Sequence, residues 1–107
     1  MPDDHAIERE AVRELRGAIL RYLATSYRFH TSAAEESVKK HCLKIMRAPV
    51  GRYNEAICYL RDEAVGLVKV EPVKVDGLDE EPVEFLKLTA RGYLLVTGQH
   101  TDPGVVM

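Results

Sequence analysis

The stretch from Thr31 to Val68 decides the fold, and it reads TSAAEESVKKHCLKIM, then RAPVG, then RYNEAICYLRDEAVGLV. Its pattern predicts a helix, a tight turn, a second helix and then a strand that starts at Gly66. Ser32, followed three residues later by Glu35, is typical of a capping box at the start of the first of these helices. Apolar residues then recur at the spacing of one helical face: Ala34, Val38, Cys42 and Ile45.

Pro49 and Gly51 mark the turn between the two helices. Proline cannot continue a helix, and it biases Ala48 before it away from helical backbone angles. We expect Gly51 to allow the sharp change of direction into the second helix. The buried face of that helix is predicted to hold Tyr53, Ile57, Leu60 and Ala64. Two short helices joined in this way form a helix-turn-helix.

A long amphipathic helix is predicted before this stretch, over residues 6–27. Its apolar stripe is formed by Val12, Leu15, Ile19 and Tyr22 or Leu23. We place the basic side chains of Arg9, Arg13 and Arg16 on its outer face. The helix is expected to lie across the helix-turn-helix and to complete a three-helix core.

A hairpin and a short helix are predicted after the stretch. Two runs, LVKVEPVKV and VEFLKL, are rich in strand-forming residues and are separated by the turn signal Asp76-Gly77. Pro72 and Pro82 each remove a backbone donor, which favours a two-stranded ribbon at an edge. Thr89 is expected to cap a last helix, ARGYLLVT, that ends at Gly98.

The expected fold class is therefore α+β and mostly α. The architecture is a winged helix-turn-helix with a three-helix core, a two-stranded wing and a short C-terminal helix. A length of 107 residues is that of one domain. We assign residues 1–98 to the winged-helix domain and residues 99–107 to a C-terminal tail, which either docks on the domain or frays.

The charges are unevenly distributed along a chain whose net charge is only −2. The segment from Ser37 to Asn54 holds no acidic residue and five basic ones: Lys39, Lys40, Lys44, Arg47 and Arg52. From Glu71 to Glu84, six acidic residues accompany Lys74 alone. This distribution predicts a polarised molecule whose basic end is the helix-turn-helix.

The compartment is predicted from what the sequence lacks. It has no apolar run of the length that crosses a bilayer, and its start, MPDDHAIERE, is too charged for a signal peptide. Its two cysteines lack CxxC spacing, which fits a reducing environment. We therefore expect a cytoplasmic protein without a membrane partner.

Several short motifs resemble those of a known superfamily. The segments LRGAILRYLA, GLVKVEPV and LKLTARGYLLV resemble the winged-helix transcription-regulator superfamily, in which the hairpin runs into an LT-x-x-G cap. That cap corresponds here to residues 88–92. More narrowly, the ILRYLA helix, the YRF segment and the tail pattern G-x-x-x-D-P-G-V resemble small winged-helix proteins of Mu-like phages and prophages. The resemblance implies a DNA-binding transcriptional regulator encoded by a phage or prophage; the acidic wing tip departs from it.

Candidate DNA contacts follow from the docking geometry of a helix-turn-helix. The second helix lies in the major groove and reads bases, while the first crosses the phosphate backbone. The residues predicted to face bases are Arg52, Asn54, Tyr59 and Arg61. The residues predicted to contact phosphates are Lys39, Lys40, Lys44 and Arg47. Glu55 and Asp62 lie close to the base-facing set and would oppose binding to DNA.

Helix-turn-helix modules usually bind DNA as homodimers. In this chain the first helix, the last helix and the VVM tail offer apolar surface for pairing.

The sequence also offers features that point away from DNA binding. The acidic wing tip, with Asp79, Glu80 and Glu81, is either a solvated loop or a contact for a basic protein partner, without any DNA role. Cys42 and Cys58 lie on adjoining helices, but cytoplasmic thiols favour no disulfide, and with His41 they match no zinc spacing. No phosphate-binding loop, HExxH motif or nucleophile–base pair is present, so we expect no enzyme, no cofactor and no metal.

Overall fold

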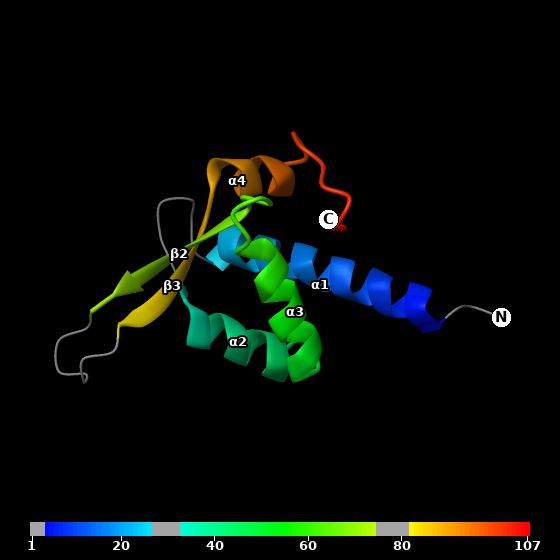
Figure 1. Ribbon diagram of the computed structural model, residues 1–107, viewed down its shortest axis with the longest axis horizontal. Coiled ribbons are helices and arrows are strands. Elements are labelled where there is room, and N and C mark those ends of the chain that lie inside the picture. Colours follow the sequence, from blue (N-terminus) through cyan, green and yellow to red (C-terminus); the bar gives the residue numbers. More distant parts are fainter. Residues whose placement is uncertain (1–3, 27–32, 75–81) are drawn as a thin grey trace.

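The computed structural model describes residues 4–26, 33–74 and 82–107. Its elements follow the order of a winged helix, with four helices and a small antiparallel sheet (Figure 1). The elements are α1 (Asp4–Ser26), β1 (Ala33–Ala34), α2 (Glu35–Lys44), α3 (Val50–Leu60), β2 (Val68–Val73), β3 (Val83–Leu88) and α4 (Ala90–Val96). The expected fold class, a mostly helical α+β winged helix-turn-helix, is confirmed.

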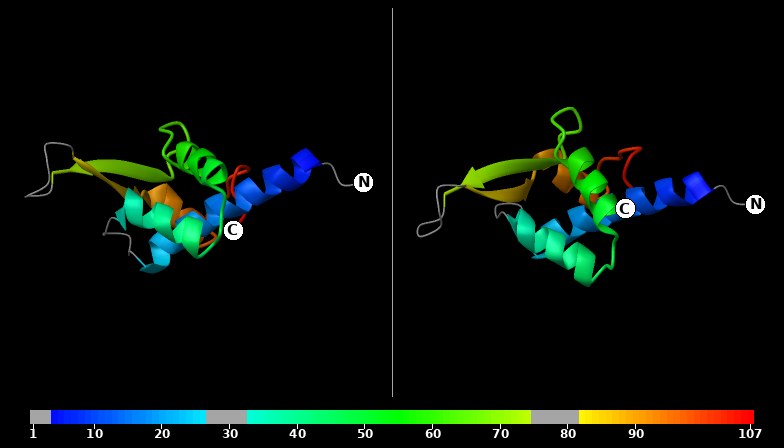
Figure 2. Two further views of the ribbon diagram at one scale, coloured as in Figure 1. Left: turned by 90° about the horizontal axis from the view of Figure 1, so that it is seen from below. Right: turned by 60° about the horizontal axis from the view of Figure 1, so that its bottom comes forward.

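The long helix α1 buries the stripe predicted for it. Val12, Leu15, Ile19 and Leu23 are all buried, and Tyr22 packs at the edge of the core. In Figure 1, α4 lies above α1 and α2 lies below it, while α3 crosses in front. The N-terminal part of α1 projects from one end of the molecule, and the β2–β3 ribbon projects from the other (Figure 2). None of the helices in the described ranges is both long and apolar enough to cross a membrane.

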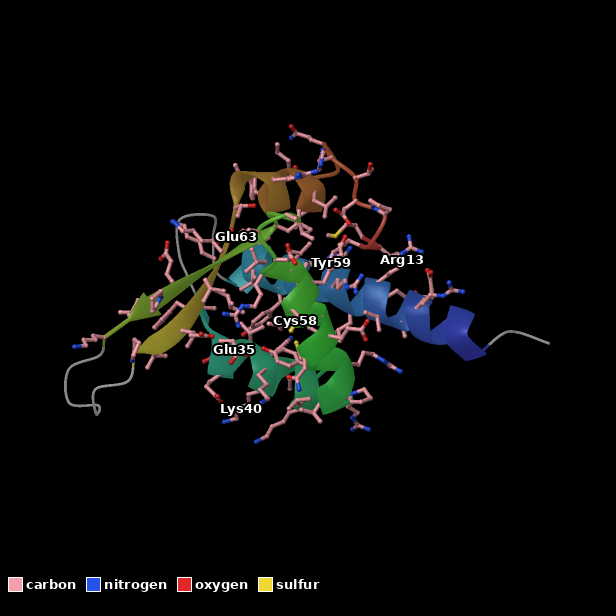
Figure 3. The ribbon with its side chains drawn as sticks, viewed as in Figure 1. Arg13, Glu35, Lys40, Cys58, Tyr59 and Glu63 are labelled. Atoms are coloured by element: carbon pink, nitrogen blue, oxygen red, sulfur yellow. The ribbon has the colours of Figure 1, made fainter. Side chains whose placement is uncertain are left out.

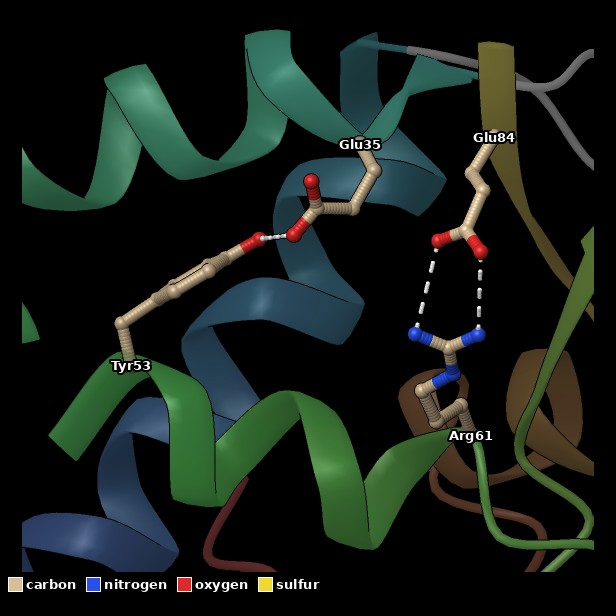
Figure 4. Close-up of polar contacts among 4 residues, drawn as sticks. All are labelled: Glu35, Tyr53, Arg61 and Glu84. Carbon is tan, nitrogen blue, oxygen red and sulfur yellow. Dashed lines mark hydrogen bonds and ion pairs between the residues drawn. The ribbon is translucent and has the colours of Figure 1, made fainter. Parts of the chain in front are cut away.

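The start of α2 differs from the predicted capping box. The helix begins at Glu35 with Ala34 as its N-cap, and no side chain caps it. Ser32 lies outside the described residues. The Glu35 carboxylate instead accepts a 2.7 Å hydrogen bond from the hydroxyl of Tyr53, a side chain that is otherwise buried (Figure 4). Glu35 therefore joins α2 to α3 rather than closing its own helix.

The turn between α2 and α3 is built differently from the prediction. The left-handed backbone lies at Arg47, with φ of 55°, whereas Gly51 already belongs to α3. Because α2 ends at Lys44, Ile45 leaves the apolar face and is 70% exposed; its predicted place in the core is wrong. Pro49 serves as the N-cap of α3, a position where its missing N–H costs nothing.

Helix α3 is shorter than its apolar periodicity predicted. Tyr53, Ile57 and Leu60 are buried as expected, but the helix stops at Leu60 and Ala64 is exposed. The carboxylate of Asp62 accepts a hydrogen bond of 2.8 Å from the backbone N–H of Ala64 and so stabilises a turn here. Gly66 then takes a left-handed conformation, with φ of 68°, before the sheet begins.

The sheet has one strand more than the predicted two-stranded wing. Its order is β1-β3-β2, all antiparallel, with Val68 opposite Leu88 and Val73 opposite Val83. The extra strand β1 pairs Ala33 with Leu86 and thereby ties the entry of α2 to the base of the wing. Pro72 lies in β2 at the edge of this sheet, as predicted, and Pro82 precedes β3. Residues 75–81, which include the predicted turn and wing tip, lie outside the described ranges.

The cap of α4 is as predicted. The Thr89 hydroxyl accepts a 3.0 Å hydrogen bond from the backbone N–H of Gly92 and donates one of 2.6 Å to the Gly66 carbonyl. The helix ends before Gly98, which has φ of 80°.

The tail, residues 99–107, docks rather than frays. Val105 is buried, and the N–H of Val106 donates to the carbonyl of Arg13 at 3.1 Å. The guanidinium of Arg16 donates to the carbonyl of Gly104 at 2.9 Å. The tail thus packs along α1 and reaches the C-terminal half of α3.

Candidate nucleic-acid interface

The outer side of α2 carries the four residues predicted to contact phosphates, which we call the basic surface: Lys39, Lys40, Lys44 and Arg47. Lys40 and Lys44 are exposed one helical turn apart, on the side opposite the buried Val38 and Cys42. Lys39 is half-buried at the flank, and Arg47 is exposed in the turn that follows. A shallow depression along this side is lined by Glu36, Ser37, Lys39, Lys40, Leu43 and Lys44.

Helix α3 presents an exposed stripe, which we call the outward stripe: Val50, Gly51, Asn54, Glu55 and Cys58. Asn54 is fully on this stripe, as its predicted base-facing role requires. Cys58 lies on the front of α3, one turn further along (Figure 3). Asn54 is exposed on this stripe, and its position therefore leaves it open to a ligand.

Arg52 takes a different direction from Asn54. It is half-buried in a groove between α1 and the turn, lined also by Glu14, Met46 and Arg47. Its Nε atom is buried and has no hydrogen-bond partner among the described residues. The structure thus places Arg52 at the flank of α3, where it faces α1.

Tyr59 lies on the side of α3 that meets the tail. The guanidinium carbon of Arg16 stacks 3.8 Å from the centre of its ring, a cation–π contact. The Tyr59 hydroxyl donates a 2.5 Å hydrogen bond to Asp102. Burial and this bond to a carboxylate raise the pKa of Tyr59 above its ordinary value. These contacts hold α3, α1 and the tail together at one point.

Arg61 is engaged by the wing. Its guanidinium forms a two-pronged contact with the carboxylate of Glu84 on β3, with distances of 3.4 and 3.5 Å (Figure 4). Both side chains are partly exposed, so the pair contributes little to stability. It does, however, join the end of α3 to the wing.

The two acidic residues expected to oppose DNA both have partners. Glu55 lies 3.9 Å from the guanidinium of Arg16, and Asp62 accepts from the Ala64 N–H, as described above. Arg16 was predicted on the outer face of α1, and that placement is wrong, because its side chain is only 13% exposed. Its spacing from Val12 and Ile19, four and three residues, already puts it at the margin of the buried stripe.

The remaining candidates are the two cysteines, His41 and the acidic residues of the wing tip. Cys42 is buried and Cys58 exposed, and both are free thiols. His41 stacks on Tyr22, with ring centres 4.0 Å apart. In the parts of the chain that the structure describes, no three His, Cys, Asp or Glu side chains could jointly hold a metal ion. Asp79, Glu80 and Glu81, the acidic contact of the alternative hypothesis, lie outside those ranges.

The fold has a counterpart among solved structures. An X-ray structure of a PadR-like transcription factor from Bacteroides fragilis aligns with a TM-score of 0.66, over 89% of this chain and 84% of that chain. The two sequences are 18% identical, so the likeness shows a shared winged-helix fold. No family model matches this sequence, and no curated protein matches it.

Proposed function

We propose that this protein is a DNA-binding transcriptional regulator that lays α3 in the major groove. The single observation that carries the proposal is that α2, with the basic surface, and α3, with the outward stripe, are consecutive helices joined by a short turn. A helix-turn-helix docks with its first helix across the phosphates and its second in the groove. The winged-helix neighbour, itself a PadR-like transcription factor, supports the same function. We further propose that the protein forms a homodimer in the cytoplasm. The sequence motifs that resemble those of Mu-like phage proteins support a phage or prophage origin.

The predicted contact residues take different parts in this proposal. The basic surface supplies phosphate contacts, and Asn54 contacts a base edge. Arg52 and Tyr59 hold α3 in place through their contacts with α1 and the tail. Arg61, which is paired with Glu84 in the structure, contacts a phosphate when it leaves that carboxylate.

The test is a titration of duplex DNA at several salt concentrations. Each phosphate contact contributes about 0.9 to the slope of log affinity against log salt. We expect Lys40→Glu with Lys44→Glu to weaken binding to every duplex and to lower the slope by about 2. The matched control, Arg21→Glu with Arg91→Glu, makes the same change of charge on α1 and α4, away from the basic surface. Absence of binding to any duplex at low salt would overturn the proposal.

The acidic segment from Glu71 to Glu84 favours a second candidate, a winged helix that binds a basic protein and not DNA. Exposed acidic side chains attract basic partners at a rate that falls with salt. In this case the triple variant Asp79→Asn, Glu80→Gln and Glu81→Gln abolishes capture of the partner. The same variant leaves DNA affinity unchanged or improves it if the first proposal holds.

A further inference from the structure

The N-terminal turns of α3 combine an apolar and an amide side chain on the outward stripe. Val50, the first residue of the helix, is 53% exposed, and Asn54 follows it one turn later. Between them, a Cβ added to Gly51 would meet no atom within 4 Å, so this end of the helix is open to a close approach. In a docked helix-turn-helix, these N-terminal turns come nearest to the base edges.

The arginines of α3 are directed away from this end. Arg52 is half-buried against α1, and Arg61 sits beyond the last turn, paired with Glu84. A bidentate arginine is the commonest reader of guanine in the major groove. Because neither arginine lies on the outward stripe, guanine has no such reader there.

From this arrangement, and on the basis of the proposed function, we infer that α3 recognises A·T base pairs. The side-chain amide of Asn54 accepts from N6 of adenine and donates to its N7. The methyl groups of Val50 contact the C5-methyl of a nearby thymine. Four residues of helix span about 6 Å, which is roughly two base-pair steps along the groove. The recognised element is therefore a short A·T segment in each half-site.

The first test is selection of bound sequences from a random duplex pool. The wild-type protein is expected to enrich a core of A·T pairs. The Asn54→Ala variant should lose about tenfold in discrimination at one adenine, as expected for loss of one bidentate contact. Gln99→Ala removes an exposed amide from the tail and should leave the selected core unchanged.

The second test removes a methyl group from the DNA. Replacing the contacted thymine by deoxyuridine should weaken wild-type binding by about threefold to fourfold, the effect of one buried methyl. The Val50→Ala variant should bind both duplexes equally, and Val50→Thr, which keeps one methyl, should fall between. Leu94→Ala, at an exposed apolar residue on α4, should keep the full wild-type penalty.

The outcomes separate this inference from the function it rests on. Salt-sensitive binding with a G·C core, or with no sequence preference, overturns A·T recognition while DNA binding stands. An unchanged adenine preference in Asn54→Ala, or an unchanged deoxyuridine penalty in Val50→Ala, also overturns it. Absence of any binding at low salt overturns both. Both side chains are exposed, so the thermal unfolding of each variant should match that of the wild-type protein and verify that the fold is intact.

Discussion

The buried thiol of Cys42 and the buried hydroxyl of Tyr53 make the stability of the fold depend on pH in the alkaline range. Burial raises the pKa of Cys42 from 9.0 to about 11, and burial together with the hydrogen bond to Glu35 raises that of Tyr53. Each folded group therefore keeps its proton after the unfolded chain has lost its own. The resulting stabilisation is fully present below the pKa of the unfolded group and is lost as the pH rises toward that of the folded one.

We therefore expect the free energy of unfolding to fall by about 2 kcal/mol between about pH 9 and pH 11, from Cys42 alone. Because the pKa of Tyr53 is also raised, the free energy of unfolding continues to fall at higher pH. Urea unfolding at a series of pH values measures the effect. The Cys42→Ala variant should begin with lower stability but lose less of it over this window. A free energy of unfolding that stays constant to about pH 11 would contradict the raised pKa of Cys42.

The residues that sequence reasoning placed correctly are those with a local signal. Thr89 precedes its helix at the spacing of a cap, and Val12, Leu15 and Ile19 repeat with the period of α1. The contacts of Arg16 and Asp102 carried no such signal. Their shared partner, Tyr59, lies 43 residues after Arg16 and 43 residues before Asp102. No local pattern could reveal that a basic and an acidic side chain meet at one phenol.

At the scale of the elements, Cys58 offers a test of how α3 docks. Its thiol is exposed at the C-terminal end of the outward stripe, while Cys42 is buried in the core. If α3 enters the groove, bound duplex DNA should slow alkylation of Cys58 by a maleimide at least severalfold, because the groove walls exclude the reagent. Mass spectrometry of the modified protein measures the rate, and Cys42 serves as the internal reference. Equal rates with and without saturating DNA would show that another face binds.

The contact between α3 and the wing leads to another prediction. Glu84→Gln removes a carboxylate and frees Arg61 for a phosphate, so DNA affinity should rise by about threefold, with stability changed by less than about 1 kcal/mol. Glu71→Gln is the matched control. It removes an acidic side chain from the neighbouring strand, where Glu71 lies 3.9 Å from Lys69, but leaves Arg61 paired. Equal gains in the two variants would mean that net charge, and not Arg61, causes the change.

The elements themselves were predictable to different degrees. The strand β3 and the helix α4 match the expected segments because each is bounded by strong local signals. The strand β1 was missed, since two alanines have no strand preference and their pairing with β3 is a long-range contact. Helix α3 was predicted too long because Ala64 continues its period, and the side chain of Asp62 was not recognised as the start of a turn.

At the scale of the whole molecule, two glycines fit the tail against the helices. A Cβ added at Gly17 would lie 1.9 Å from the carbonyl oxygen of Val106, and one at Gly104 would lie 2.2 Å from the Tyr59 hydroxyl. Neither glycine has a positive φ, so close approach is the reason for glycine at these sites. The tail is thus fitted to α1 and α3 as part of the core.

This close packing predicts that the effect of Gly17→Ala on the free energy of unfolding has opposite signs with and without the tail. Gly17→Ala should destabilise the protein by about 1–3 kcal/mol, because the added methyl displaces the tail. In a protein that lacks residues 99–107, the same substitution should stabilise α1 by about 0.5–1 kcal/mol, the helix preference of alanine over glycine. Urea unfolding of the four proteins measures both effects. Gly51→Ala, with open space around it, is the control and should not destabilise either background. Destabilisation by Gly17→Ala in both backgrounds would show that the tail is not the cause.

The docked tail also orders events during synthesis. Asp102 is translated 43 residues after Tyr59, so α3 leaves the ribosome long before the carboxylate that fixes its hydroxyl. The bond from the Val106 N–H to the Arg13 carbonyl holds the tail on α1, so α3 lacks the support of the docked tail until residues 102–106 have emerged. If the proposed function holds, α3 would take its final position for DNA binding only after the tail has been translated.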